Sequence, residues 1–134
     1  MFGGADGQRP GDTWAFDGVL NTWEKVSNED HMGISAPTPR ARHAMVYDTA
    51  LGKTILFGGA PDGNPLGDTW AFDGNTNTWT KLLVEDEKGL SAPSPRWGHA
   101  IAYDAFSGKI ILFGCADGPR PRVASASVGV LNPP

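Results

Sequence analysis

The chain has 134 residues and a mass of 14.2 kDa, enough for one domain, and its 18 glycines and 11 prolines favour turns over long helices. A formal net charge of −4 gives no electrostatic reason to bind nucleic acid or an anionic membrane, and no apolar run is long enough to span a bilayer. The single cysteine, Cys115, excludes an intramolecular disulfide and a multi-cysteine metal site. These observations predict a soluble, turn-rich, all-β chain.

The predicted elements follow an internal repeat with a period of 56 residues. Residues 11–58 align with residues 67–114 without a gap, with 30 identities in 48 positions. Within one period, alternating apolar residues and turn residues predict four short strands. In chain order these strands cover about residues 42–47, 53–58, 68–73 and 78–82. Four antiparallel strands per repeat of this length are typical of a β-propeller blade.

Four features of the repeat resemble the kelch family over residues 2–114. They are a glycine pair after an apolar strand, an aromatic-x-aromatic-Asp strand, a tryptophan on the last strand, and a Pro-Arg-x-x-His segment before the first strand. The sequence is most similar to the kelch repeats of galactose-oxidase-type propellers. This resemblance implies a propeller of about six or seven blades that serves as a scaffold for binding other molecules.

The strands amount to about two blade equivalents, whereas a closed propeller takes about four to eight blades. We expect a half blade with strands three and four, a full blade with its preceding long loop, a half blade with strands one and two, and an irregular tail. These units cover residues 1–27, 28–83, 84–114 and 115–134, respectively. Three interpretations follow: a fragment of a longer propeller, an open two-blade stack, or copies that complete one another's blades in a homo-oligomeric ring.

Most of the repeated residues are expected to have structural roles. Gly58 and Gly59 are expected to adopt positive φ angles where strand two ends, and His43 and His99 to pack or bond to the backbone. The tryptophans are expected to pack between blades: Trp14, Trp23, Trp70 and Trp79. Two histidines without a third ligand do not make a metal site, so no metal or cofactor is expected.

The candidate binding residues lie on the long connections. Because antiparallel strands alternate in direction, the segments at about residues 59–67 and 83–97 should emerge on one face, where binding usually occurs. The candidates there are Asp62, Asn64, Glu85, Asp86, Glu87, Arg96 and Trp97, together with Arg40. Trp97 aligns with Ala41 in the other repeat, so the fold does not require it, and it is the best single contact candidate. The two arginines have two interpretations: bonds to loop carbonyls or a neighbouring Asp, or a cationic ring that binds an acidic ligand at the channel mouth.

The predicted function is that of a non-catalytic scaffold that binds protein partners through this face, with a carbohydrate as the second candidate ligand. Two alternatives stay open. One is the propeller part of a secreted carbohydrate-active or galactose-oxidase-like enzyme whose catalytic residues lie elsewhere, and the other is a truncated, non-functional gene fragment. The compartment also stays open, because a signal peptide is absent from this chain but an incomplete N-terminus would remove one.

Overall fold

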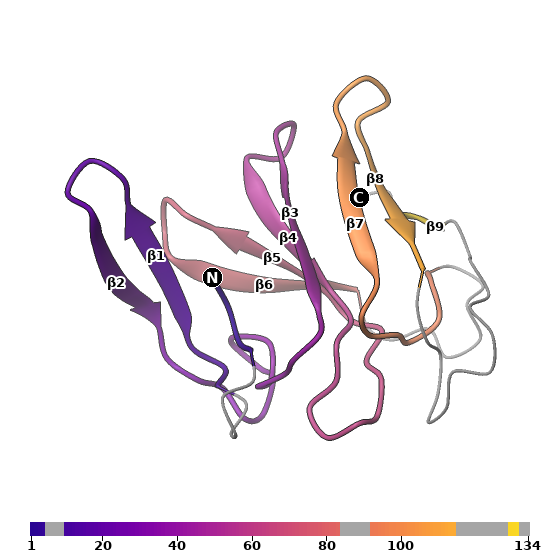
Figure 1. Ribbon diagram of the computed structural model, residues 1–134, viewed down its shortest axis with the longest axis horizontal. Coiled ribbons are helices and arrows are strands. Elements are labelled where there is room, and N and C mark those ends of the chain that lie inside the picture. Colours follow the sequence, from indigo (N-terminus) through magenta and orange to yellow (C-terminus); the bar gives the residue numbers. More distant parts are fainter. Residues whose placement is uncertain (5–9, 84–91, 115–128, 132–134) are drawn as a thin grey trace.

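The computed structural model describes residues 1–4, 10–83, 92–114 and 129–131, and these residues form nine β-strands in three antiparallel sheets (Figure 1). The strands are β1 (Thr13–Asp17), β2 (Thr22–Ser27), β3 (Ala44–Asp48), β4 (Lys53–Phe57), β5 (Thr69–Asp73), β6 (Thr78–Leu83), β7 (Ala100–Asp104), β8 (Lys109–Phe113) and β9 (Gly129–Leu131). The prediction of an all-β fold built from antiparallel sheets is confirmed. This part of the chain contains no helix that is long and apolar enough to cross a membrane.

The middle sheet is a complete four-stranded blade with the strand order β3-β4-β5-β6. Each of its strands begins and ends within two residues of the predicted bounds. The β1–β2 hairpin repeats the β5–β6 pairing: Phe16 is opposite Trp23 as Phe72 is opposite Trp79, and both pairs have an irregular register after the first threonine. The repeat in sequence is therefore a repeat in strand register.

The short turns of the β1–β2, β3–β4, β5–β6 and β7–β8 hairpins each follow an aspartate that ends the first strand of the hairpin. The Oδ1 atom of Asp48 accepts hydrogen bonds from the backbone N–H groups of Ala50 and Leu51. Asp17, Asp73 and Asp104 accept equivalent bonds in the other three turns. Such bonds between an aspartate and its own turn stabilise the turn locally.

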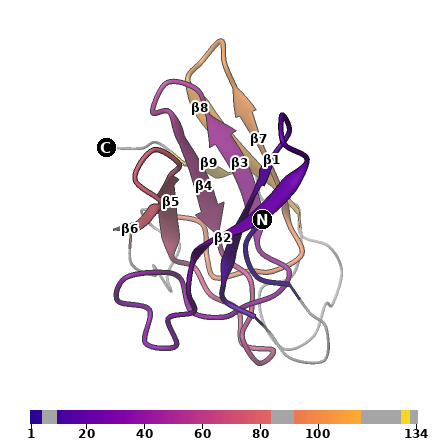
Figure 2. The same ribbon diagram turned by 90° about the vertical axis from the view of Figure 1, so that its left-hand side faces the viewer.

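Two apolar clusters hold the three sheets together. Figure 2 views the ribbon from the end at which the β1–β2 hairpin lies. The first cluster, between the β1–β2 hairpin and the middle sheet, contains Phe2, Ala36, Leu56, Trp70 and Trp79. The second cluster, between the middle sheet and β7–β8, contains Ile55, Phe57, Ala71, Ile110 and Leu112. Because successive side chains of a strand point to opposite faces, β4 contributes Leu56 to one cluster and Ile55 to the other. Both faces of the middle sheet are thereby buried.

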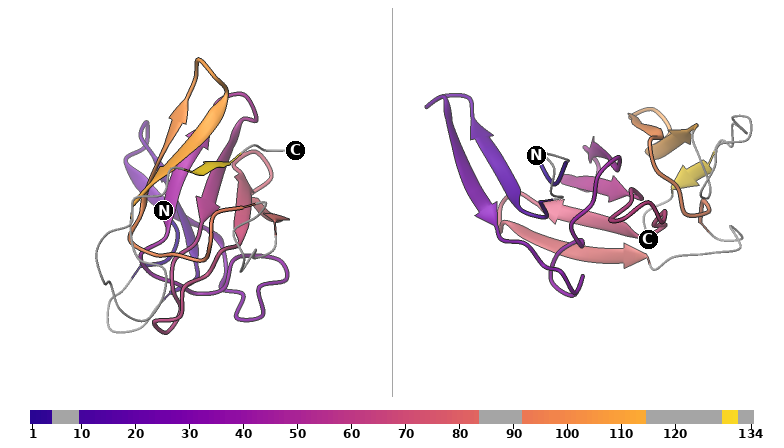
Figure 3. Two further views of the ribbon diagram at one scale, coloured as in Figure 1. Left: turned by 90° about the vertical axis from the view of Figure 1, so that its right-hand side faces the viewer. Right: turned by 60° about the horizontal axis from the view of Figure 1, so that its bottom comes forward.

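Not all four tryptophans pack between sheets. Trp70 is fully buried and Trp79 is 6% exposed, but Trp23 is 55% exposed on the outer side of the first hairpin. Trp14, on the same hairpin, is half-buried. The expectation of inter-blade packing is thus wrong for Trp23, because no described sheet lies against that side of the hairpin (Figure 3).

The tail contains a strand that the sequence did not predict. Residues Gly129–Leu131 form β9, which pairs with β8 as β5 pairs with β4: Ile111 is opposite Val130, as Ile55 is opposite Ala71. The expectation of an irregular tail therefore fails for these three residues. A second copy of the chain would have to displace β9 before it could pair with this edge of β8.

Candidate binding site on the long-loop face

The long connections emerge together on one side of the molecule, opposite the hairpin turns (Figure 1). We call this side the long-loop face and define it by residues 28–43, 58–68 and 92–99. The first strands of the two neighbouring sheets, β3 and β7, lie beside each other, so the segments that lead into them meet on this face. The residues just before these two strands are therefore neighbours in space although 56 positions separate them in sequence.

The arginine that occurs in both repeats, as Arg40 and as Arg96, is buried in each. Arg40 is 1% exposed, and its guanidinium forms two hydrogen bonds with the Asp68 carboxylate and one with the Gly58 carbonyl oxygen. Arg96 is 4% exposed and donates to the Ser94 carbonyl and hydroxyl oxygens. Both guanidiniums therefore bond to groups of their own loops, and that of Arg40 also bonds to the Asp68 carboxylate. Their burial is at odds with a cationic ring that binds a ligand at the surface.

Two histidines, the half-buried His43 and the buried His99, follow these arginines in the chain. His43 packs edge-on against Phe2, and His99 packs in the same way against Phe57, both with ring centroids 5.4 Å apart. Burial, together with the neighbouring arginine in each case, lowers the pKa of both imidazoles to about 4. Both rings are therefore neutral at pH 7 and belong to the packing between sheets.

The glycine pair lies where this packing is tightest. Gly58 has a φ angle of +66°, and a Cβ atom there would lie 2.5 Å from the Arg96 carbonyl oxygen. Gly59 has a φ angle of +94°, and a Cβ atom there would lie 2.9 Å from the His43 Cβ. Any side chain at either position would thus push apart the two connections that lead into β3 and β7.

The remaining candidates are distributed over the face. Asp62 and Asn64 are exposed, and the Asn64 amide and backbone N–H groups both donate to the Asp62 carboxylate within their own loop. Trp97 is half-buried beside the entry to β7. Three further predicted residues, Glu85, Asp86 and Glu87, lie outside the described residues. Of the predicted set that the structure describes, Trp97 has the most distinctive surroundings.

Trp97 forms a stack with Arg42, a residue that the motif analysis did not select. The Arg42 guanidinium carbon lies 4.4 Å from the centroid of the indole ring, and the Arg42 carbonyl accepts a 2.7 Å bond from the Gly98 N–H. Arg42 is exposed, and its guanidinium has no hydrogen bond or ion pair with any described residue. Its φ angle is +59°, in the region that favours glycine.

The repeat itself marks this pair. Ala41 and Arg42 align with Trp97 and Gly98, so the small and large residues are exchanged between the two copies. The large residue of each copy is the one that enters the stack. A comparison of the two repeats for mismatched neighbours, rather than for shared motifs, would have found Arg42.

Across the part of the chain that the structure describes, no group of three or more His, Cys, Asp or Glu side chains is arranged to hold a metal ion. On the long-loop face, Asp62 and Arg40 are engaged in hydrogen bonds with neighbouring residues, and Arg42 stacks on an aromatic ring.

Comparison with known proteins agrees with the architecture. The family model described as the KLHDC2/KLHL20/DRC7 Kelch-repeats domain matches residues 1–127.

Similar proteins are large and diverse. Human multiple epidermal growth factor-like domains protein 8 is 33% identical over 104 residues, which are 76% of this chain and 3% of that protein. A tRNA wybutosine-synthesizing protein 4 from Emericella nidulans is 31% identical over 72% of this chain and 10% of the relative. The dynein alpha chain of the flagellar outer arm from Chlamydomonas reinhardtii is 31% identical over 85% of this chain and 2% of the relative. The chain thus spans a tenth or less of the length of these relatives.

Proposed function

Because the chain belongs to the kelch-repeat family, we propose that it binds protein partners through the long-loop face, with Arg42 and Trp97 at the centre of the contact. Kelch-repeat domains commonly mediate protein interactions. One observation carries the proposal for this site: an exposed guanidinium is held over an indole ring and has no hydrogen-bond acceptor among the described residues.

The chemistry of this pair defines the partner. A guanidinium presents its N–H donors in a planar fork that fits a carboxylate with two parallel hydrogen bonds. Stacking on Trp97 orients the plane of the fork before a ligand arrives, which lowers the entropy lost on binding. Arginine and tryptophan are also the residues that most often dominate interface energies. The partner segment should therefore carry an aspartate, a glutamate or a terminal carboxylate.

The backbone at Arg42 supports a role beyond folding. A non-glycine residue in the left-handed region costs about 1–2 kcal/mol, and the other repeat has Gly98 at the equivalent position. Arginine at this position therefore carries a backbone cost that glycine would avoid, which indicates that its side chain contributes something that glycine cannot. We assign that contribution to ligand contact, because the arginine side chain projects from the fold rather than filling its core.

We also propose that the contact is non-catalytic. Of the described histidines near the face, His43 is half-buried and His99 is buried, and their lowered pKa values keep both neutral, which suits packing. A protein partner is favoured over a carbohydrate because Arg42 covers the face of Trp97 on which a sugar ring would stack.

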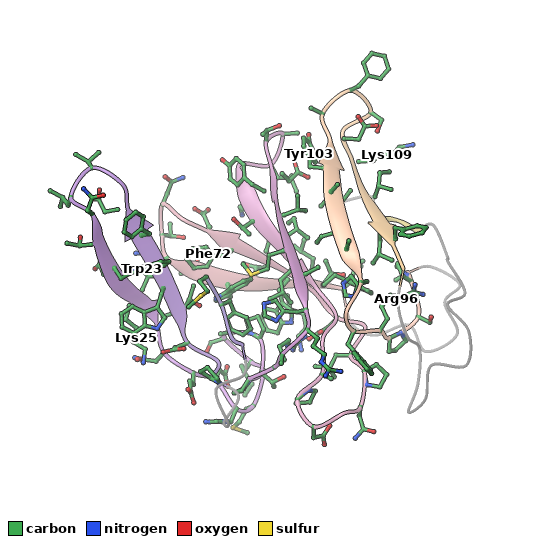
Figure 4. The ribbon with its side chains drawn as sticks, in the orientation of Figure 1. Trp23, Lys25, Phe72, Arg96, Tyr103 and Lys109 are labelled. Carbon is green, nitrogen blue, oxygen red and sulfur yellow. The ribbon has the colours of Figure 1, made fainter. Side chains whose placement is uncertain are left out.

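A peptide selection tests this function. A displayed library of random 12-residue peptides is selected on the immobilised full chain, and the dissociation constants of the selected peptides are measured by fluorescence anisotropy. We expect enrichment of Asp and Glu over the unselected library. Arg42→Gln should weaken binding about tenfold or more, whereas Lys109→Gln should change it less than about twofold. Lys109 makes a matched control because it carries the same charge on the hairpin side of the molecule (Figure 4).

Two results would count against the proposal. The first is selected peptides without acidic enrichment, and the second is equal loss of binding in the Arg42 and Lys109 variants. Equal loss would mean that net charge, rather than the stacked guanidinium, drives association.

A further inference from the structure

A cavity of about 300 Å³ lies apart from the Arg42–Trp97 stack, between the connection from β2 to β3 and the outer strand β6. We call it the rim pocket, and its lining residues are Met32, Gly33, Thr38, Arg40, Leu66, Asp68 and Lys81. Its volume is at the lower end of the range for small-ligand sites and is large enough for one or two side chains. Neither Arg42 nor Trp97 lines it.

One cation at the rim pocket has no counter-ion in the part of the chain that the structure describes. Arg40 and Asp68 form a buried ion pair and cancel each other. Lys81 is exposed, and its ammonium lies 4.7 Å from the centroid of the Trp70 ring. No described residue forms an ion pair with it.

The first repeat shows what this lysine can bind. Lys25 is the equivalent of Lys81, and Asp12 is the equivalent of Asp68. Lys25 forms an ion pair of 3.2 Å with Asp12. In the second repeat the equivalent aspartate pairs with Arg40, so Lys81 keeps its place over a tryptophan ring but has no carboxylate partner among the described residues. A carboxylate from outside would restore the arrangement of the first repeat.

An ordered loop with apolar side chains lies beside Lys81. The Asp30 carboxylate accepts hydrogen bonds from all five backbone N–H groups of residues 32–36 and from the Ser35 hydroxyl. This network holds the pKa of Asp30 well below its usual range, chiefly through the bonds from Ser35. The loop displays Met32 and Ile34 at 79% and 75% exposure, and Met32 also lines the pocket. The equivalent of Met32 in the other repeat is Lys88, so the fold does not require methionine there.

These observations together describe a binding surface. A loop that is already ordered loses little entropy when a partner covers its apolar side chains, and methionine adapts to varied shapes. We propose that the rim pocket binds a protein segment that places an apolar side chain against Met32 and Leu66 and a nearby carboxylate on Lys81. This second contact does not depend on the Arg42–Trp97 site.

Two small probes test the pocket on the full chain. N-acetyl-L-leucinate has both features of the proposed segment, and N-acetyl-L-leucinamide lacks only the carboxylate charge. Each is titrated while the backbone amides are followed in ¹H–¹⁵N correlation spectra. We expect saturable shifts at Met32, Gly33 and Lys81, with the amide probe binding about tenfold more weakly.

Four variants separate this site from its alternatives. Lys81→Met should abolish the carboxylate preference while the remaining spectrum stays dispersed, and Lys81→Arg should retain it. Lys25→Met, the equivalent change in the first repeat, should leave the titration unchanged, and so should Arg42→Gly. Equal binding of the two probes, shifts elsewhere only, or equal effects of Lys81→Met and Lys25→Met would overturn the proposal. None of these results would bear on peptide binding at Arg42.

Discussion

The β1–β2 hairpin and the β5–β6 hairpin have nearly the same sequence and strand register but different surroundings. Trp79 is 6% exposed, because the Phe2 ring lies 5.3 Å away and the indole N–H donates to the Thr13 hydroxyl. Trp23, its equivalent, is 55% exposed. Figure 4 labels Trp23 on the outermost hairpin and Phe72 on the sheet next to it. The same residues are thus core in one copy and surface in the other.

The strand-two phenylalanines show the same effect along the stack. Phe2 and Phe57 are 2% and 0% exposed, and each packs against a histidine of the next sheet. Phe113, their equivalent in the last sheet, is 58% exposed. A blade sequence therefore specifies strands, turns and register, whereas burial of its faces depends on the neighbouring blade.

The largest expected effect on stability comes from removing the tryptophan whose burial differs most between the two hairpins. Trp79→Ala should lower the free energy of unfolding by about 3–5 kcal/mol, because it leaves a cavity against Phe2 and an unpaired Thr13 hydroxyl. Trp23→Ala should cost less than about 1 kcal/mol. Urea denaturation followed by circular dichroism measures both. Equal losses would show that the outer face of the first hairpin is covered in solution, for instance by a second copy.

A second contrast concerns the aspartates Asp68 and Asp12. Asp68→Asn should cost about 3 kcal/mol, because it leaves the buried Arg40 guanidinium without its counter-ion. Asp12→Asn breaks a partly exposed pair with Lys25 and should cost about 1 kcal/mol or less. The same denaturation assay compares them, and Arg40→Met combined with Asp68→Leu should cost less than Asp68→Asn alone. A double variant that is the least stable of the three would contradict this account.

Acid should weaken the packing between sheets before it affects the turns. The pKa of His43 and of His99 is about 4 in the folded chain and near 6.5 when unfolded, so the unfolded chain binds more protons in this range. The stability that neutral histidines contribute is complete above pH 6.5 and is lost as the pH falls towards 4, by about 2 kcal/mol per histidine at pH 5. Urea midpoints at pH 7.5, 6 and 5 measure this loss. His43→Gln should reduce the slope, whereas the exposed His31→Gln should preserve it.

Features that depend on neighbouring residues in sequence could be predicted well. The strands of the middle sheet were placed within two residues, because Asp48 and Gly52 form their turn with local bonds and the apolar alternation is unbroken. Features that depend on distant partners could not. β9 carries none of the repeat's motif residues and is defined only by its pairing with β8. Trp97 could be selected from the sequence, but its stack with Arg42 joins two distant connections and could not be predicted from either connection alone.

The smallest expected effect tests whether the two hairpins fold together in spite of their different burial. Asn21 and Asn77 occupy the same turn position with φ angles of +54° and +55°, a conformation that asparagine tolerates better than alanine does. Asn21→Ala and Asn77→Ala should therefore each cost about 1 kcal/mol in global urea denaturation, because the strain is local and identical. Equal costs require that the first hairpin unfolds with the middle sheet, as its contacts through Phe2 and Thr13 imply. If Asn77→Ala lowered global stability while Asn21→Ala only accelerated amide exchange within β1 and β2, the exposed hairpin would be a separate folding unit. The neighbouring blade would then determine cooperativity as well as burial.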